Sequence, residues 1–229
     1  MAGAVGLVVI AVVLVVVALA QGPGPGPGGP TRAVSITEGA VRTVDLQGVP
    51  GQVRIVAATG GRVRLTGNLH WSGRAPGATA RVGRDHVLWL SYRCAAASPC
   101  TENYLLVVPR DTAIVLRQPS GHVIISGLAG SLRITAASVD ISASRLRCPA
   151  LTAVITSGHM SAAFETAPRT VSVTLTSAQA TVRMPGSVSY AISSQVTSGY
   201  VHVAVPQSAA AARTVMARID SGELELLSS

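Results

Sequence analysis

The 229-residue sequence contains no lysine, so all eighteen of its basic residues are arginines. Aromatic residues make up only 3% of the chain and charged residues 12%, whereas 48% of the chain is hydrophobic. A core must therefore be built from Val, Ile, Leu and Ala, and the excess of Val, Thr and Ser over helix formers favours strands. The shortage of aromatic platforms argues against single-stranded nucleic acid, and we expect no nucleic-acid partner. The net charge of +8 favours anionic surfaces.

The first twenty residues predict a membrane segment. Residues 2–20 carry no charge, and a helix of that length, rising about 1.5 Å per residue, roughly matches the ~30 Å hydrocarbon core of a bilayer. We predict a transmembrane anchor at 1–20, with a signal segment cleaved after Ala20 as the alternative. The Gly/Pro-rich stretch "GPGPGPGGP" cannot join a sheet and predicts a linker at 21–33. Residues 34–229 remain for one folded domain.

The three cysteines bear on the compartment. Cys94 and Cys100 bracket "AAASP", a spacing that a local disulfide can close, and such a bond persists outside the cytosol. Cys148 is left over as a buried residue or a free thiol. Three unpaired cysteines in a cytosolic domain are the alternative, and Arg32 and Arg42, which follow the apolar segment, also favour that orientation. We expect a single-pass cell-membrane protein whose C-terminal domain is extracytoplasmic.

An internal repeat organises the rest of the chain. Its copies are "PSGHVII", "ASVDISA", "TSGHMSA", "TSAQATV", "TSGYVHV" and "DSGELEL", whose serines lie 18, 19, 20, 21 and 23 residues apart. Two, four and six residues before the last five serines the chain is almost always apolar, as in a strand with one buried face. Three residues after the serine the side chains are again apolar, as at Met160, Val201 and Leu224, and these side chains should point inward. The side chains two residues after the serine are polar.

Units of this kind predict an all-β protein: a single-stranded β-helix or β-solenoid with rungs of about 20 residues, stacked ~4.8 Å apart. Degenerate copies occur as "PGQVRIV" near Gly51 and "GGRVRLT" near Gly61. The alternative treats each Ser-Gly as a hairpin turn in an antiparallel meander. The near-constant period favours the solenoid.

The run from Tyr104 to Ser144, "YLLVVPRDTAIVLRQPSGHVIISGLAGSLRITAASVDISAS", resembles a bacterial family of β-strand-repeat candidate adhesins, a domain of unknown function. That pattern has a strand ending in Val-Pro, further strands, and repeated "SG" corners around "GLxG". The resemblance covers roughly residues 34–227 and departs from the family where the usual Ser-Gly-Asp corner becomes Ser-Gly-His or Ser-Gly-Tyr. It implies a right-handed, β-helix-like fold outside the membrane, often behind a membrane span, and a scaffold or adhesive role.

The candidate site residues follow from the repeat. His122, Asp140 and His159 occupy the same outward position on successive rungs and could converge on a divalent metal. An outward column must be polar in any case, however, so we assign no metal and no cofactor. Arginines on the outer surface are expected to contact anions, and the candidates are Arg62, Arg64, Arg133 and Arg183.

The function predicted from the sequence is a non-catalytic scaffold, adhesin-like or envelope-binding role, tethered by the N-terminal helix. The partners expected are anionic cell-envelope polymers or another surface protein. The alternative is a carbohydrate-active β-helix enzyme acting on envelope or extracellular polysaccharide, which would need clustered carboxylates in a groove. In the repeats Asp140 and Glu223 share a column, but we expect them four rungs apart, so we predict no enzyme.

Overall fold

The computed structural model describes residues 31–48, 50–95 and 99–229, and every element in these ranges is a strand. The predicted membrane segment 1–20 and most of the linker lie outside them. In the ranges described, no helix is long and apolar enough to cross a membrane. The strands are β1 (Thr31–Gly39), β2 (Thr43–Gln47), β3 (Gly51–Ala58), β4 (Arg62–Trp71), β5 (Gly77–Val82), β6 (Val87–Arg93), β7 (Cys100–Pro109), β8 (Ala113–Ser126), β9 (Leu132–Leu146), β10 (Ala150–Phe164), β11 (Thr170–Met184), β12 (Ala191–Ala204) and β13 (Thr214–Ser228).

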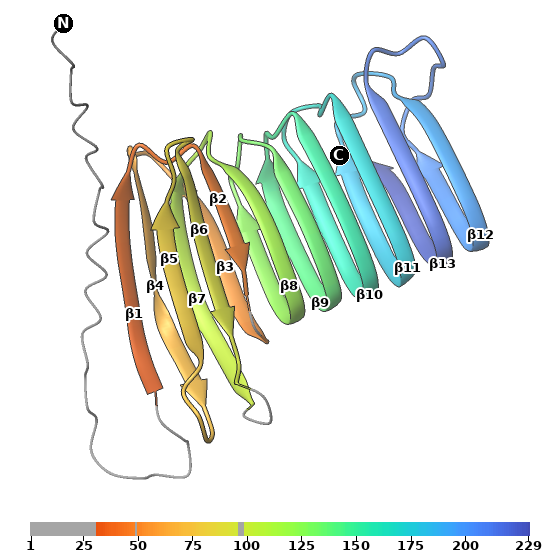
Figure 1. Cartoon of the computed structure of the whole chain (residues 1–229). Coiled ribbons are helices and arrows are strands. Elements are labelled where there is room, and N and C mark those ends of the chain that lie inside the picture. Colours follow the sequence, from red (N-terminus) through yellow and green to blue (C-terminus); the bar gives the residue numbers. More distant parts are fainter. Residues whose placement is uncertain (1–30, 49, 96–98) are drawn as a thin grey trace, which may run out of the picture.

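Each repeat copy is one long strand folded into a V. Strands β8 to β13 each bend at their central serine, and neighbouring strands pair in parallel along both arms of the V (Figure 1). We call the residues before the serine the first arm and those after it the second arm. The bends gather at one end of the molecule, the corner end, and the connections between rungs gather at the other, the connection end. The parallel stack agrees with the predicted solenoid and excludes a meander for these copies.

The rungs are not stacked in chain order. The sheet runs β8-β9-β10-β11-β13-β12, so β13 is inserted between β11 and β12. Glu223 therefore lies between Gln179 and Tyr200 rather than beyond Tyr200, and Asp140 and Glu223 are three rungs apart instead of the predicted four.

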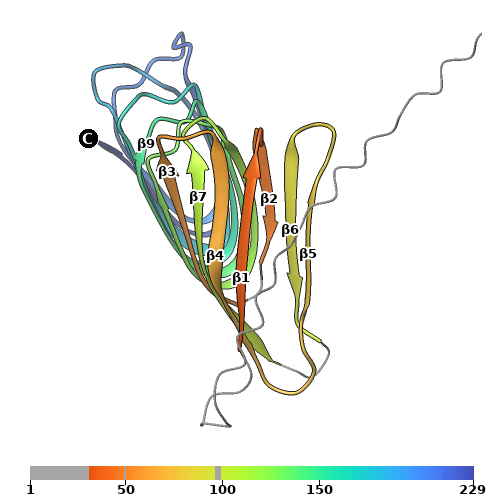
Figure 2. The ribbon, with the colours of Figure 1, turned by 90° about the vertical axis from the view of Figure 1, so that its left-hand side faces the viewer.

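The N-terminal part also forms V-shaped rungs, but each is made of two strands. β2 and β3 continue the parallel stack beside β8, and Gly51 pairs with Gly121 as the sequence pattern predicted. β6 and β7 form the next rung. Figure 2 shows the two arms, with β3 and β7 on one and β2, β6 and β5 on the other.

The prediction of a single-stranded solenoid throughout residues 34–229 is wrong at this N-terminal end. β4 pairs antiparallel with both β1 and β7, and β5 pairs antiparallel with β6. The copy near Gly61 is therefore part of a reversed rung. The alternation of apolar residues is the same in both directions, so the pattern could not reveal the reversal.

The core lies between the two arms and extends from Ile36 in β1 to Leu226 in β13. Met160 and Leu224 are buried, 3% and 0% exposed, as their column predicted. Val201 also faces the core but is only partly buried. Its strand, β12, is the terminal rung and has a neighbour on one side only.

The corners explain the Ser-Gly pairs. Gly158 has φ +104°, and a Cβ there would lie 2.3 Å from the carbonyl oxygen of Val139 on the neighbouring rung. Only glycine fits such a close backbone approach in this region of φ. The serines hold the bend from outside, since the hydroxyl of Ser157 donates to the Ala137 carbonyl at 3.1 Å and lies 3.0 Å from the Ser138 hydroxyl.

Candidate binding surfaces

A row of polar side chains crosses the outer surface of the second-arm sheet. These residues are cross-strand neighbours from β4 to β12: Asn68, Asn103, Gln52, His122, Asp140, His159, Gln179, Glu223 and Tyr200. Two hollows of about 600 and 470 Å³ lie along this polar row and share Gln52 in their linings. The row is thus a shallow polar track perpendicular to the strands.

The structure brings His122, Asp140 and His159 together as predicted. Nε2 of His122 lies 3.3 Å from one carboxylate oxygen of Asp140, and Nδ1 of His159 lies 3.5 Å from the other. The three side chains are 54–69% exposed. Over the part of the chain that the structure describes, no group of three or more His, Cys, Asp or Glu side chains is arranged to hold a metal ion. The contacts make the triplet a solvated segment of the polar row.

The polar row ends at a second cluster, on β13 and β12. Glu223 and Glu225 alternate on β13 and face the same side, where they accept hydrogen bonds at 3.2 Å from the Gln179 amide and the Thr181 hydroxyl. The negative charge of Glu223 raises the pKa of the Tyr200 phenol. Both glutamates lie on one strand, in the alternating "ELE" of the sequence, so the comparison of carboxylates on adjacent rungs could not pair them.

The four predicted anion contacts do not converge. Arg62 and Arg64 lie at the start of β4, Arg183 near the end of β11, and Arg133 at the start of β9 on the first arm. Six rungs, or roughly 29 Å at the spacing of paired strands, separate β4 from β11. These side chains share one feature, which is that each lies within three residues of the connection end.

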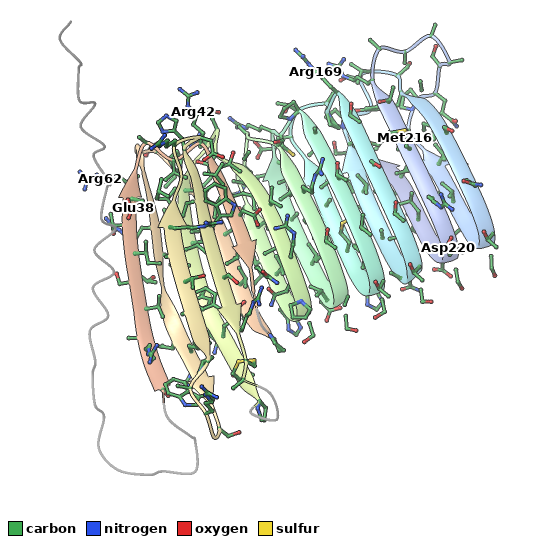
Figure 3. The ribbon with its side chains drawn as sticks, viewed as in Figure 1. Glu38, Arg42, Arg62, Arg169, Met216 and Asp220 are labelled. Carbon is green, nitrogen blue, oxygen red and sulfur yellow. A yellow bond between two sulfur atoms is a disulfide. The ribbon has the colours of Figure 1, made fainter. Side chains whose placement is uncertain are left out.

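A larger set of arginines occupies the connection end. We call it the arginine edge: Arg42, Arg62, Arg84, Arg110, Arg145, Arg147, Arg169 and Arg213. Figure 3 shows Arg42, Arg62 and Arg169 at this end and Asp220 at the opposite, corner end. All members are exposed except the half-buried Arg213. Four carboxylates share this end: Glu38, Asp85, Asp111 and Glu165.

Two members of the arginine edge have fixed partners. The Arg147 guanidinium donates to Glu165 at 2.7 Å, and that of Arg145 donates to the Ser126 hydroxyl at 2.8 Å. Because the carboxylates are half as numerous as the arginines, the edge keeps an excess of positive charge. The strand pattern missed this surface because most of its members lie in connections and the others at the ends of strands. The available signal was the recurrence of arginine between strands, which becomes one surface only when the rungs stack.

A disulfide joins Cys94 and Cys100, whose Cα atoms are 5.6 Å apart, at the corner of the rung formed by β6 and β7. Beside it in the core the rings of Tyr92 and Tyr104 stack 4.9 Å apart, and burial raises the pKa of both phenols above their ordinary range.

Cys148 is a buried free thiol, and burial raises its pKa to about 11. Its thiolate is therefore scarce at neutral pH.

Nested V-shaped rungs, paired mostly in parallel around one aliphatic core, define an all-β, adhesin-like toastrack fold. The family described as Toastrack DUF4097 matches residues 112–226, half of the chain. The protein therefore belongs to the Toastrack DUF4097 family, which confirms the resemblance seen in the sequence. A comparison with curated proteins gave no match.

The fold is similar to that of a solved structure. A candidate cell adhesion protein from Clostridium sporogenes is 12% identical, with a TM-score of 0.53 over 86% of this chain and 100% of that one. A candidate adhesin from Bacteroides fragilis is 11% identical, with a TM-score of 0.43 over 85% and 97% of the two chains. A further one, from Parabacteroides distasonis, is 12% identical with a TM-score of 0.32 over 87% and 98%. The protein is therefore a member of a family of unknown function, and it shares its fold with the candidate cell adhesion protein from Clostridium sporogenes.

Proposed function

We propose that this protein is a membrane-tethered, extracytoplasmic scaffold that holds anionic cell-envelope polymers through its arginine edge, without catalysing a reaction. The arginine edge is the observation that carries the proposal. Stacking of rungs distributes guanidinium groups along one end of the sheet, and guanidinium forks match carboxylate and phosphate groups. A polymer that spans several rungs would make many weak contacts at once.

The location rests on two supports. The uncharged residues 2–20 are long enough to cross a bilayer, and the Cys94–Cys100 disulfide is of a kind that persists outside the cytosol. The Gly/Pro-rich residues 22–30 would then act as an extended tether between membrane and sheet. Tethering suits a binding role because it keeps the arginine edge close to the polymers of the envelope.

The absence of catalysis is supported by the polar row. Asp140 contacts two histidines on adjacent rungs and lies three rungs from Glu223, while Glu223 and Glu225 are held by the neighbouring amide and hydroxyl groups. We therefore expect a bound polysaccharide to keep its length, whereas a carbohydrate-active enzyme would shorten it.

Two polymers test the proposal with the purified full chain in neutral detergent: a phosphate-bearing teichoic acid and a carboxylate-bearing polygalacturonate. Both should bind at low salt and weaken steeply toward physiological salt, because exposed charges are screened over ~8–10 Å. Size-exclusion chromatography should show no shortening of either polymer. Salt-independent binding, or no binding at low salt, would overturn the electrostatic proposal.

A matched pair of variants localises the contact. Arg110→Gln with Arg169→Gln removes two exposed charges from the arginine edge, and Arg54→Gln with Arg218→Gln removes two exposed charges from the sheet faces. The edge variant should weaken polymer binding about threefold or more, and the face variant less than about twofold. Both should melt as the wild type does. Equal losses would show that only net charge matters.

A further inference from the structure

A tryptophan lies outside the core on the first-arm sheet. Trp89, on β6, is half-buried and belongs to the outward side of its strand, between the buried Leu88 and Leu90. The chain has only two tryptophans, and the other, Trp71, packs against the core. One edge of the Trp89 ring packs against Gly83, where an added Cβ would lie 2.4 Å from the indole, and the rest of the ring lies on the outer side of the sheet. Such rings offer flat apolar surfaces to ligands.

One arginine stacks on this ring, and another lies on β8, two strands away. The guanidinium carbon of Arg81, the cross-strand neighbour on β5, lies 4.8 Å from the ring centroid of Trp89. On the other side, on β2, Asp45 accepts from the guanidinium of Arg117 on β8. Stacking on an indole and pairing with a carboxylate each restrict a flexible arginine side chain, so that less freedom is lost when a ligand binds.

These residues line one groove of about 580 Å³, a volume in the range of small-ligand sites. Its lining also includes Arg93 and the side chains of Gln47, Thr79 and Ser91. The Ser91 hydroxyl lies 3.4 Å from the Gln47 side-chain oxygen. The groove, which we call the Trp89 groove, thus combines three arginines, one carboxylate, an indole, two hydroxyls and an amide.

This combination matches one ligand chemistry. The indole suits the apolar C–H face of a sugar ring, the hydroxyl and amide groups suit sugar hydroxyls, and the excess of arginine over carboxylate suits an anion. Asp45, the one carboxylate of the lining, already pairs with Arg117, so a neutral sugar would leave Arg81 and Arg93 without an anionic partner. An inorganic anion would make no contact with the face of the indole away from Arg81. The best match is therefore a sugar that carries an anionic group.

We propose that the Trp89 groove binds one anionic sugar unit, carrying a carboxylate or a phosphate, of an envelope saccharide. This rests on the proposed function for the kind of polymer, and it adds a specific subsite on a different surface from the arginine edge. The arginine edge would hold a chain by its charge, and the Trp89 groove would recognise the sugar itself.

Isothermal titration calorimetry of the full chain in neutral detergent, at physiological salt, tests the groove. The probes are trigalacturonate and glucose 6-phosphate, compared with neutral maltotriose and with inorganic phosphate. At least one anionic sugar should bind with a stoichiometry of one, and maltotriose and inorganic phosphate should bind at least about tenfold more weakly. The two anionic sugars distinguish a carboxylate from a phosphate ligand.

Variants assign the binding to the groove. Trp89→Ala and Arg93→Gln should each weaken the anionic sugar about tenfold or more, and Arg93→Gln does so without altering the Arg81 stack. The controls Tyr200→Ala and Arg218→Gln remove an exposed aromatic ring and an exposed arginine outside the groove, and they should change affinity less than about twofold. Melting curves identify any variant that fails to fold.

The outcomes separate the two proposals. If both sugars fail to bind, or bind Trp89→Ala as well as the wild type, the Trp89 groove is refuted; the proposed function survives if the polymers still bind through the arginine edge. If an anionic sugar binds through Trp89 while polymer binding is insensitive to the edge variant, the groove stands and the edge proposal fails. If neither sugars nor polymers bind, both are wrong.

Discussion

The inserted position of β13 leads to a quantitative prediction. Leu224 of β13 is 0% exposed, with Ala180 of β11 and Val201 of β12 as its cross-strand neighbours. Truncation of a fully buried leucine to alanine costs about 2–5 kcal/mol, and at about 2–4 °C per kcal/mol Leu224→Ala should lower the melting temperature by roughly 4–20 °C. Val201 lies in the terminal rung and is only partly buried, so Val201→Ala should cost about 1 kcal/mol or less.

Circular dichroism melts and urea titrations of the two variants measure this difference. A stack in chain order would place β12 inside and β13 at the end, and would reverse the result. A larger loss for Val201→Ala than for Leu224→Ala would therefore refute the strand order. Aspartate variants sharpen the comparison: Leu224→Asp buries an unpaired charge and should prevent folding, whereas Val201→Asp, at a partly buried position of the terminal rung, should keep a cooperative melt.

Three further predictions concern the corners, the buried thiol and the disulfide. Gly158→Ala should destabilise far more than Gly127→Ala in urea titrations, although both residues have positive φ. The added Cβ at Gly158 would lie 2.3 Å from the Val139 carbonyl oxygen, whereas at Gly127 its nearest neighbour is the Ala57 Cβ at 3.6 Å; equal losses would contradict the corner packing. Because burial raises the pKa of Cys148 from 9.0 to about 11, the folded state binds this proton more tightly than the unfolded state. The resulting stabilisation is complete below pH 9 and is lost as the pH rises toward 11. The difference in urea midpoint between the wild type and Cys148→Ala should therefore decline over that window, and a difference that does not change with pH would argue against the raised pKa. Thiol labelling of intact cells without reductant should find Cys94 and Cys100 blocked, and free thiols facing the cytosol would overturn the proposed topology.

The sequence predicts the repeats well because alternating apolar residues report which face is buried. The pairing of His122 with Asp140 follows directly from the period of the serines. The same alternation carries no direction, which is why the reversed β4 looked like another parallel copy. It also does not order the last two rungs, because both β12 and β13 alternate; the one difference is Ser194, a polar residue in the inward column of β12, opposite Ala217 of β13.

The binding surfaces were harder to predict for a different reason. Arg42, Arg110 and Arg169 are scattered along the chain and come to lie at the same end of the molecule only through the stacking of rungs. Alternation within β6, where Leu88 and Leu90 are buried, already places Trp89 on the outer side. Its neighbours in the groove depend on the register of β6 with β2, and β6 has no Ser-Gly corner to mark that register. Sites built from one residue per rung need the rung order first.

The order of the rungs also constrains how the chain can assemble during synthesis. β12 leaves the ribosome before β13, yet its place in the sheet lies beyond a strand that does not yet exist. The open side of β11 must therefore wait for β13, or β12 must first occupy that side and later give it up. Either way, the nascent chain cannot lengthen its stack simply by adding each rung to the last. A chain shortened after residue 213 would leave β12 without its neighbouring strand, so β13, although made after β12, holds this end of the sheet in place.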